Sequence, residues 1–304
     1  MITSFNQIIT EVQAGARRMI AVAGADDEHV LQAVIQAGEK GIADAVLVGN
    51  GSRIESALRK CCAAPGSFAI EHVEGELSKT AEKTVSLVTD GTADAVMKGR
   101  MDTSILLKAV LNEKSLRTER FMGVLGIIEP ASYGKLIFLT DGGFIIRPTL
   151  EQKIDLIRNG VELVRKLGIQ VPKVGVVCAI EKVNEKMPDT LEAAELVRMN
   201  REGAISGCIV EGPFGFDNAV SAEAAARKGV QGEVPGDADI LVFPDLVSAN
   251  AVYKAMGFLA GVKTAGYLAG ANVPIILSSR ADSADTKLNS IAIAALAVGA
   301  NRQE

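Results

Sequence analysis

The sequence predicts an α/β protein of two domains, in which mainly parallel sheets are flanked by helices. Short runs rich in Val, Ile and Ala recur along the chain, and each ends in Gly, Asp, Ser or Asn before a helical pattern begins. Strands that alternate with helices form parallel sheets covered on both faces. The 30 glycines and the aromatic share of 4% favour tight strand-to-helix turns. At 304 residues the chain exceeds the usual size of one domain.

Nine of these runs are predicted as strands because they are short, apolar and bounded by turn residues. In chain order they are residues 19–23, 45–48, 95–97, 121–128, 136–139, 174–180, 208–210, 240–243 and 274–277.

One helix can be bounded at both ends. Thr149 and Gln152 have the spacing of a capping box, which marks a helix start. Apolar residues recur at helical spacing from Ile154 to Val164, and Gly168 is typical of a helix end. The sequence therefore predicts a helix shortly after the polar segment 140–143.

Polar residues gather where three predicted strands end. In open α/β sheets, ligands bind beyond the carboxyl ends of the strands, so these segments are candidates for a site. They are residues 98–102, 140–143 and 244–250.

The expected joint between the domains is a strand crossing, because no Pro-rich or Ser-rich linker separates two halves. A chain that leaves the first domain near Ile128 and returns near Gly270 gives a first domain of residues 1–128 with 269–304. The second domain is then residues 129–268. This arrangement would place Ser279 and Arg280 in the first domain, facing the second across a cleft.

The segment from Ser278 to Asp285 is the most informative of the chain. It follows the predicted strand 274–277 and precedes an apolar helical run, so its side chains lie beside unpaired N–H groups at a helix start. The fork of donors on Arg280 suits phosphate or a developing oxyanion, and the carboxylates offer a base nearby. The segment therefore predicts an anion site with catalytic groups.

A purely structural reading of the same segment is also open. Asp282 or Ser283 would cap the helix and Asp285 would lie in its first turn, since these residue types are preferred there. Ser279 and Arg280 precede the cap, and capping does not explain them.

Charge and hydropathy exclude several function classes. The net charge is −5 and the Lys and Arg residues are scattered, so a general nucleic-acid binder is not expected. The N-terminus lacks the basic start and apolar stretch of a secretory signal. The longest apolar run, residues 291–300, is roughly half of what a membrane span requires. We expect a cytoplasmic protein that does not bind membranes.

The cysteines and histidines predict neither a disulfide nor a metal site. Cys61 and Cys62 are adjacent, no CxxC spacing occurs, and the two histidines form no ligand cluster. Cys178 and Cys208 lie in apolar runs and are expected to be buried as small hydrophobic residues.

Cofactor motifs are largely missing. Residues 49–54 begin like a dinucleotide fingerprint but lack its third glycine, and no P-loop pattern occurs. A nicotinamide enzyme and a P-loop hydrolase are therefore disfavoured, and residues 49–51 are interpreted as a tight turn.

Four motifs in order resemble the phosphate acetyl/butyryltransferase family over nearly the whole chain. They are Val96–Arg100, Phe138–Gly143 with Pro148–Thr149, Phe243–Leu246 with Asn250 and Tyr253–Lys254, and Ser279–Arg280. The last motif, continued to Ser283, resembles the butyryltransferase branch. Each motif alone is weak, whereas four in this order are specific.

The resemblance implies reversible transfer of a short acyl group, butyryl or acetyl, from acyl-CoA to inorganic phosphate, giving acyl phosphate and CoA. The CoA thioester and phosphate are then substrates, and neither a bound cofactor nor a metal is implied. The resemblance also implies a fold similar to isocitrate and isopropylmalate dehydrogenases, with the active site in the interdomain cleft. A homodimer or a higher homo-oligomer is implied as well.

The resemblance also assigns catalytic roles. Ser279 is expected to hydrogen-bond at the thioester and Arg280 to stabilise charge on the attacked carbonyl or on phosphate. Counting seven residues on from the serine reaches Thr286 and not an aspartate, so the base is Asp285, with Asp282 as the alternative.

Eight further residues are expected to bind substrate: Lys98, Gly99, Arg100, Asp141, Gly142, Asn250, Lys254 and Ser283. Asn250 and Lys254 lie four apart and share a helix face, where capping and packing are an equal alternative.

The expected reaction is a direct displacement between two negatively charged reactants, so the protein must chiefly neutralise and align them. No Ser-His or Cys-His arrangement is apparent, and a covalent acyl-enzyme is not expected. Two alternatives remain: a decarboxylating dehydrogenase of the related fold, and a two-domain ligand-binding protein without catalysis.

Overall fold

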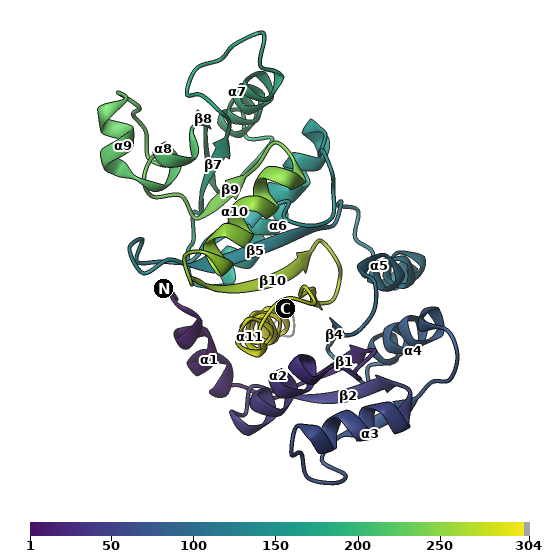
Figure 1. Cartoon of the computed structure of the whole chain (residues 1–304). Helices are drawn as coiled ribbons and strands as arrows, with labels where there is room; N and C mark the ends of the chain where they lie inside the picture. Colours follow the sequence, from purple (N-terminus) through teal and green to yellow (C-terminus); the bar gives the residue numbers. More distant parts are fainter. Residues whose placement is uncertain (301–304) are drawn as a thin grey trace. The chain divides into compact units, whose positions relative to one another are not determined.

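The contacts within the chain divide it into two compact units (Figure 1). The terminal unit comprises Phe5–Glu119 and the chain from Ala265, and the central unit comprises Met1–Ser4 and Arg120–Thr264. The structure is a computed structural model and describes residues 1–300. The domain boundaries given above stay a prediction.

The terminal unit contains a mostly parallel sheet with the strand order β3-β2-β1-β4-β11-β10. Only β10 runs antiparallel to its neighbour β11 in this unit. The strands are β1 (Arg18–Ala23), β2 (Ala43–Gly49), β3 (Ala69–His72), β4 (Ala95–Lys98), β10 (Lys263–Ala269) and β11 (Ile275–Ile276).

Helices cover this sheet because their apolar stripes pack on its Val, Ile and Ala side chains. They are α1 (Phe5–Gln13), α2 (Glu28–Glu39), α3 (Gly51–Lys60), α4 (Leu77–Thr89), α5 (Thr103–Asn112) and α11 (Ala284–Ala300), with a short 3₁₀ helix η1 (Lys114–Leu116). The helix α11 packs against α1 and α2, and α4 packs on β1, β2 and β4 (Figure 1).

The strand order creates a topological switch point between β1 and β4. From β1 the chain proceeds to β2 and β3 on one side, and it then returns to place β4 on the other side of β1. The two connections leave a crevice beyond the carboxyl ends of β1 and β4, where ligands of such sheets bind. Lys98 and Gly99 lie at this edge.

The central unit has its own sheet segment, with the order β5-β6-β9-β7-β8. The pair β5 and β6 is antiparallel, and the other pairs are parallel. The strands are β5 (Gly123–Glu129), β6 (Ile137–Thr140), β7 (Lys173–Val177), β8 (Ile209–Phe214) and β9 (Ile240–Val242). The helices are α6 (Leu150–Lys166), α7 (Pro188–Arg201), α8 (Phe216–Val220), α9 (Ala222–Arg227) and α10 (Leu246–Phe258).

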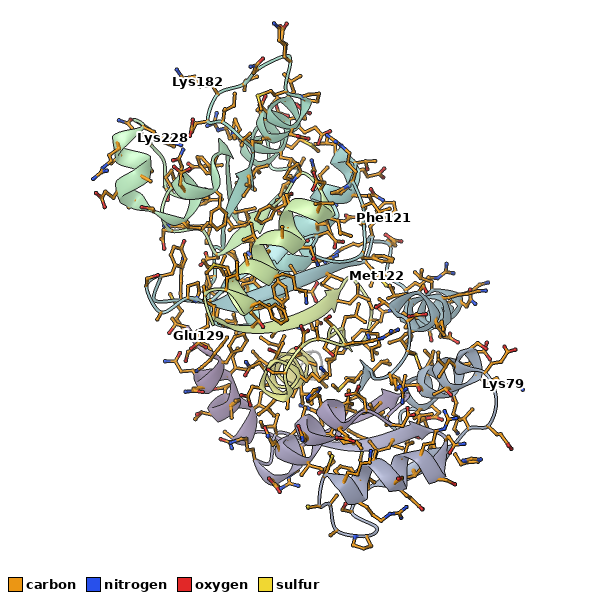
Figure 2. All side chains as sticks on the ribbon, viewed as in Figure 1. Lys79, Phe121, Met122, Glu129, Lys182 and Lys228 are labelled. Atoms are coloured by element: carbon orange, nitrogen blue, oxygen red, sulfur yellow. The ribbon has the colours of Figure 1, made fainter. Side chains whose placement is uncertain are left out.

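The predicted capping box is present at the start of α6. The Thr149 side chain accepts the Gln152 N–H, and the Gln152 side chain accepts the Thr149 N–H. Gly168 follows the last turn with a φ of +86°, which suits glycine. Elsewhere in this unit, Lys228 directly follows α9 (Figure 2). It bonds Glu181 and lies 3.0 Å from Asp217, and these pairs link the end of α9 to two neighbouring segments.

The predicted fold class is confirmed, and each of the nine predicted strands coincides with an observed strand. The sequence analysis missed β3 and β10. The residues of β3 are only half-buried or exposed, because β3 is the edge strand of the terminal unit. The strand β10 begins with Lys263 and Thr264 and includes Gly266, so no Val- or Ile-rich run marks it. Cys178 and Cys208 are buried as expected.

Among the helices of the described chain, none combines the length and the apolar character needed to cross a bilayer.

The close approach of two backbone segments at the switch point requires glycine at position 99. The Gly99 N–H donates to Ala23 O at 2.8 Å. A Cβ at Gly99 would lie 2.3 Å from Gly24 O and 2.7 Å from Ala23 O, which are backbone atoms that cannot move aside.

We predict that Gly99→Ala lowers the free energy of unfolding by about 2 kcal/mol or more, because the added methyl group forces β1 and β4 apart. Urea unfolding followed by circular dichroism measures the change. Gly15→Ala is the matched control, since its Cβ would meet only Val12 O at 3.5 Å. Equal effects of the two variants would contradict the assignment.

Candidate active site

The carboxyl ends of β1, β4 and β11 meet at one edge of the terminal sheet, because these three strands are parallel neighbours. Ala23 pairs with Lys98, and Ile276 pairs with Met97. The predicted site segments that begin at Lys98 and at Ser278 are therefore brought together by the sheet itself.

Lys98 is a buried cation whose charge is offset by only long hydrogen bonds to nearby carbonyl groups. Its side chain is 4% exposed, and within residues 1–300 its ammonium donates only to Gly99 O at 3.5 Å and to Met101 O at 3.4 Å. Burial, and then the positive charges of Arg280 and Lys287, lower the pKa of Lys98, while Asp282 acts in the opposite sense. An ammonium in this setting gains from an anion placed next to it.

Arg100 follows Lys98 at the same edge, but its side chain is exposed and lies 3.6 Å from Asp26. It lines a cavity of about 430 Å³ together with residues that follow β1 and residues of α3. Arg53 and Lys60 contribute two further cations to the lining. Glu28 pairs with Lys60 at 2.9 Å, whereas no acidic partner contacts the Arg53 guanidinium within the described chain. Asp26, Asp27 and Glu28 line the same cavity, so the charges of its lining are largely balanced, and Arg53 is the cation left for an anionic group.

A tight turn holds the Ser279 and Arg280 segment. The Ser279 N–H donates to Asp282 Oδ2 at 2.7 Å, and the Asp282 N–H donates to Ser279 O at 3.2 Å. The Ser279 hydroxyl accepts the Ala281 N–H at 3.4 Å. The carboxylate of Asp282 is buried and shapes this turn.

Lys287, in the first turns of α11, was not predicted as part of the site. Its side chain is 2% exposed, and its ammonium donates to Ser279 O at 3.2 Å and to Asp282 O at 2.5 Å. Its sequence position offered one indication of burial, because Lys287 directly precedes the apolar run from Leu288 on a helix that is apolar on most of its surface. A surface position is the ordinary expectation for such a lysine.

Arg280 points its guanidinium toward solvent. The side chain is 66% exposed and forms an ion pair with Asp102, which is 67% exposed. Surface pairs of this kind contribute about 0–1 kcal/mol to stability. Arg280 is therefore available to a ligand at little cost to the fold.

The three candidate acidic and hydroxyl residues after Arg280 have different surroundings. Ser283 caps α11, since its hydroxyl accepts the Thr286 N–H at 3.2 Å. Asp282 holds the turn, as described above. The Asp285 carboxylate is exposed in the first turn of α11 and makes no hydrogen bond or ion pair with the described residues. Of the two aspartates proposed as base, Asp285 is the accessible one.

In the central unit, Asp141 is fully buried at the end of β6. Its carboxylate accepts the N–H groups of Gly143 at 2.7 Å, Phe144 at 2.8 Å and Ile145 at 3.2 Å. Burial raises the pKa of Asp141, and these hydrogen bonds oppose that effect. Asp141 thus shapes the loop after β6, and any role in substrate binding would act through that loop.

Asn250 supports the same loop from α10, because its side-chain amide donates to Gly142 O at 2.9 Å. The Lys254 ammonium lies 5.5 Å from the ring centroids of Tyr253 and Phe258 on the same helix. These contacts join Asp141, Gly142 and Asn250 in one cluster of the central unit.

The terminal-unit edge has the chemistry of an anion site. Two buried ammonium groups, an exposed guanidinium and a hydroxyl lie around a turn whose buried carboxylate is used internally. Such an arrangement can neutralise phosphate and stabilise a developing oxyanion. Among residues 1–300, no three His, Cys, Asp or Glu side chains form a group suited to a metal ion.

Comparison with known proteins agrees with this chemistry. The family described as "Phosphate acetyl/butaryl transferase" matches residues 4–83 and 63–295. A phosphate butyryltransferase from Clostridium acetobutylicum is 45% identical over 98% of this chain and 99% of its own length. A phosphate acetyltransferase from Thermotoga maritima is 41% identical over 96% of this chain and 99% of its own length.

Solved structures give the same result. A branched-chain phosphotransacylase from Enterococcus faecalis has a TM-score of 0.81 at 30% identity, covering 92% of this chain and 99% of its own. A 4-hydroxythreonine-4-phosphate dehydrogenase from Klebsiella pneumoniae has a TM-score of 0.54 at 12% identity, covering 93% and 99%, and so shares the fold. The match of the family over most of the sequence, with relatives above 40% identity at nearly full length, shows that the chain belongs to the phosphate acetyl/butyryl transferase family.

Proposed function

We propose that this protein transfers a short acyl group, butyryl or acetyl, from CoA to inorganic phosphate in a reversible direct displacement. The observation that carries the proposal is the cluster of Lys98, Lys287 and Arg280 around the Ser279 turn. Its positive charge suits a reaction in which both substrates are anionic. The names of the full-length relatives support the same activity.

Phosphate is the nucleophile in this proposal, and Lys98 and Arg280 hold it. The buried ammonium of Lys98 supplies charge from within the sheet edge, and the exposed guanidinium of Arg280 supplies a planar fork of donors from the turn. Bringing phosphate and thioester into contact supplies several kcal/mol of the barrier.

The attack forms a bond from a phosphate oxygen to the thioester carbonyl carbon. Negative charge develops on the carbonyl oxygen, where the Ser279 hydroxyl and Arg280 donate hydrogen bonds. The carbon–sulfur bond then breaks. Asp285 takes the proton of the attacking phosphate and delivers it to the leaving sulfur, so that acyl phosphate and CoA thiol are the products.

CoA also carries phosphates at its nucleotide end. We expect Arg100 to help hold them, because it lines a cavity with Arg53 and Lys60, although Asp26, Asp27 and Glu28 line that cavity as well. In the central unit, substrate contacts by Asp141, Gly142, Asn250 and Lys254 stay a prediction. The same holds for a homodimer or higher homo-oligomer and for a cytoplasmic location.

The first test is thiol release from acetyl-CoA, propionyl-CoA and butyryl-CoA in the presence of phosphate. We predict turnover with at least one of these thioesters in the wild type, without added metal or nucleotide cofactor. Arg280→Ala is expected to lower kcat by about 100-fold or more, the loss typical of an oxyanion donor. Its free energy of unfolding should change by less than about 1 kcal/mol, because the side chain is exposed.

Arg198→Ala is the matched control, since Arg198 is an exposed, ion-paired arginine on α7. It should leave kcat unchanged. Hydride transfer to NAD in the presence of a divalent metal, without thiol release, would instead identify the alternative dehydrogenase. Equal losses of kcat and stability in Arg280→Ala would reduce Arg280 to a structural residue.

Lys98 gives a prediction about stability and pH. Because its pKa is lowered in the folded protein, the unfolded chain binds the proton more tightly and the charged ammonium lowers stability at neutral pH. That loss disappears as the pH rises through the lysine range. Lys98→Met should therefore keep or raise the free energy of unfolding, by about 1 kcal/mol, while the KM for phosphate rises about tenfold or more.

In the wild type, the KM for phosphate should rise at alkaline pH as Lys98 loses its proton, earlier than an ordinary lysine would. Initial rates at varied phosphate concentration across the alkaline range measure this effect. In Lys98→Met the rise should be absent. A phosphate KM that is unchanged in Lys98→Met would remove Lys98 from the site.

The two aspartates can be separated by comparing kcat with stability. Asp285→Asn should lower kcat by about 100-fold, within the usual contribution of a general base, and should leave the free energy of unfolding nearly unchanged because its carboxylate is exposed. Asp282→Asn should chiefly lower the free energy of unfolding, because Asp282 holds the turn. The opposite pattern would assign the base to Asp282.

A further inference from the structure

We propose that Lys287 is a positioning residue that sets the peptide planes of the Ser279–Asp282 turn, so that the N–H groups of Arg280 and Ser283 stay available as donors to an anionic substrate. This inference rests on the proposed acyl transfer, and it adds two backbone donors and one lysine to the site.

The burial of Lys287 needs a reason. At 2% exposure it is among the largest fully buried side chains of the protein, in the first turns of α11. A buried ammonium is costly unless it is hydrogen-bonded. Its bonds to Ser279 O at 3.2 Å and Asp282 O at 2.5 Å provide that compensation, and both acceptors belong to the same turn.

The two carbonyl groups are thereby directed at Lys287. In a planar trans peptide, the N–H of the next residue points away from the preceding carbonyl. The peptide bonds after Ser279 and Asp282 are trans. The N–H groups of Arg280 and Ser283 must therefore point away from the buried ammonium.

These two N–H groups have no acceptor among the described residues. Both residues are exposed. The neighbouring amides differ, since the N–H groups of Ser279, Ala281 and Asp282 are all bonded within the turn. Backbone N–H groups without an internal acceptor just before a helix start can donate hydrogen bonds to an anion.

Charge reinforces the geometry. Lys287 and Arg280 both lower the pKa of Lys98, so the three cations act on the same small volume. Asp282 faces Lys98 as well, but one of its carboxylate oxygens accepts the Ser279 N–H. The turn that carries the Arg280 and Ser283 amides therefore lies beside three cations, whose charge favours an anion near the turn.

The test compares Lys287→Met with Lys287→Arg in the full-length protein. Lys287→Met keeps a stem of similar length but removes the donors, and kcat should fall about 10-fold to 100-fold with a smaller change in the KM for acyl-CoA. Lys287→Arg keeps the charge and the donors and should recover part of kcat. Lys153→Met is the matched control, because Lys153 is equally buried at 2% but lies on α6 in the central unit.

A second readout does not depend on turnover. In ¹⁵N-resolved NMR spectra, inorganic phosphate added to the wild type should shift the Arg280 and Ser283 amide signals more than the bonded Ala281 amide. In Lys287→Met the selective shift should be lost. If Lys287→Met does not fold, Lys287→Gln replaces it in both measurements, because its shorter, uncharged side chain cannot reach Ser279 O and Asp282 O as Lys287 does.

The outcomes separate the two proposals. Absence of thiol release by the wild type would overturn the proposed function, while the phosphate titration would still support or overturn the amide site. Normal wild-type turnover, with kcat of Lys287→Met within twofold of it and unchanged amide shifts, would overturn the role of Lys287 alone.

Discussion

The proposed site depends on a buried excess of positive charge at the carboxyl edge of the terminal sheet. Lys98 and Lys287 are each less than 5% exposed, and the buried carboxylate next to them, Asp282, is engaged by the turn. Burial, and then this excess of positive charge, lowers the pKa of Lys98, and the charged ammonium lowers the stability of the fold. A dianionic substrate would supply the missing negative charge, so the feature that lowers the stability of the fold would favour substrate binding.

The sheet topology makes this concentration of charge possible. Parallel strands β1, β4 and β11 end at the same edge, and the switch of direction at β1 leaves that edge open. Gly99 allows the backbone to turn directly against β1, which keeps Lys98 inside the edge and brings Arg100 to the surface two residues later. One short loop therefore carries a buried and an exposed cation.

Much of this arrangement could be predicted because it is local in sequence. Apolar runs ending in Gly, Asp or Ser indicated nine strands, and the Thr149 and Gln152 spacing indicated a helix start. Ser279 and Arg280 were identified because they precede the helix cap and capping does not explain them. Lys287 could not be identified in this way, because its role depends on which carbonyl groups the turn directs inward. The position of Asp141 at a strand end could likewise be predicted, but the three N–H groups that its carboxylate accepts could not, because they depend on the path of the following loop.

The two buried lysines and the exposed Arg280 would contribute differently to the proposed displacement: the lysines provide fixed positive charge, and Arg280 provides donors that can change partner. The lysines act from fixed positions, since their surroundings hold them before any substrate arrives, and preorganised charge needs no reorganisation during the reaction. Arg280 is held only by a surface pair with Asp102, which contributes little and can be exchanged for a ligand. If all the cations were exposed, water would screen their charge. If all were buried, none could move its hydrogen bonds from phosphate to the thioester oxygen as negative charge develops there. The combination fits a reaction in which negative charge moves between two bound anions.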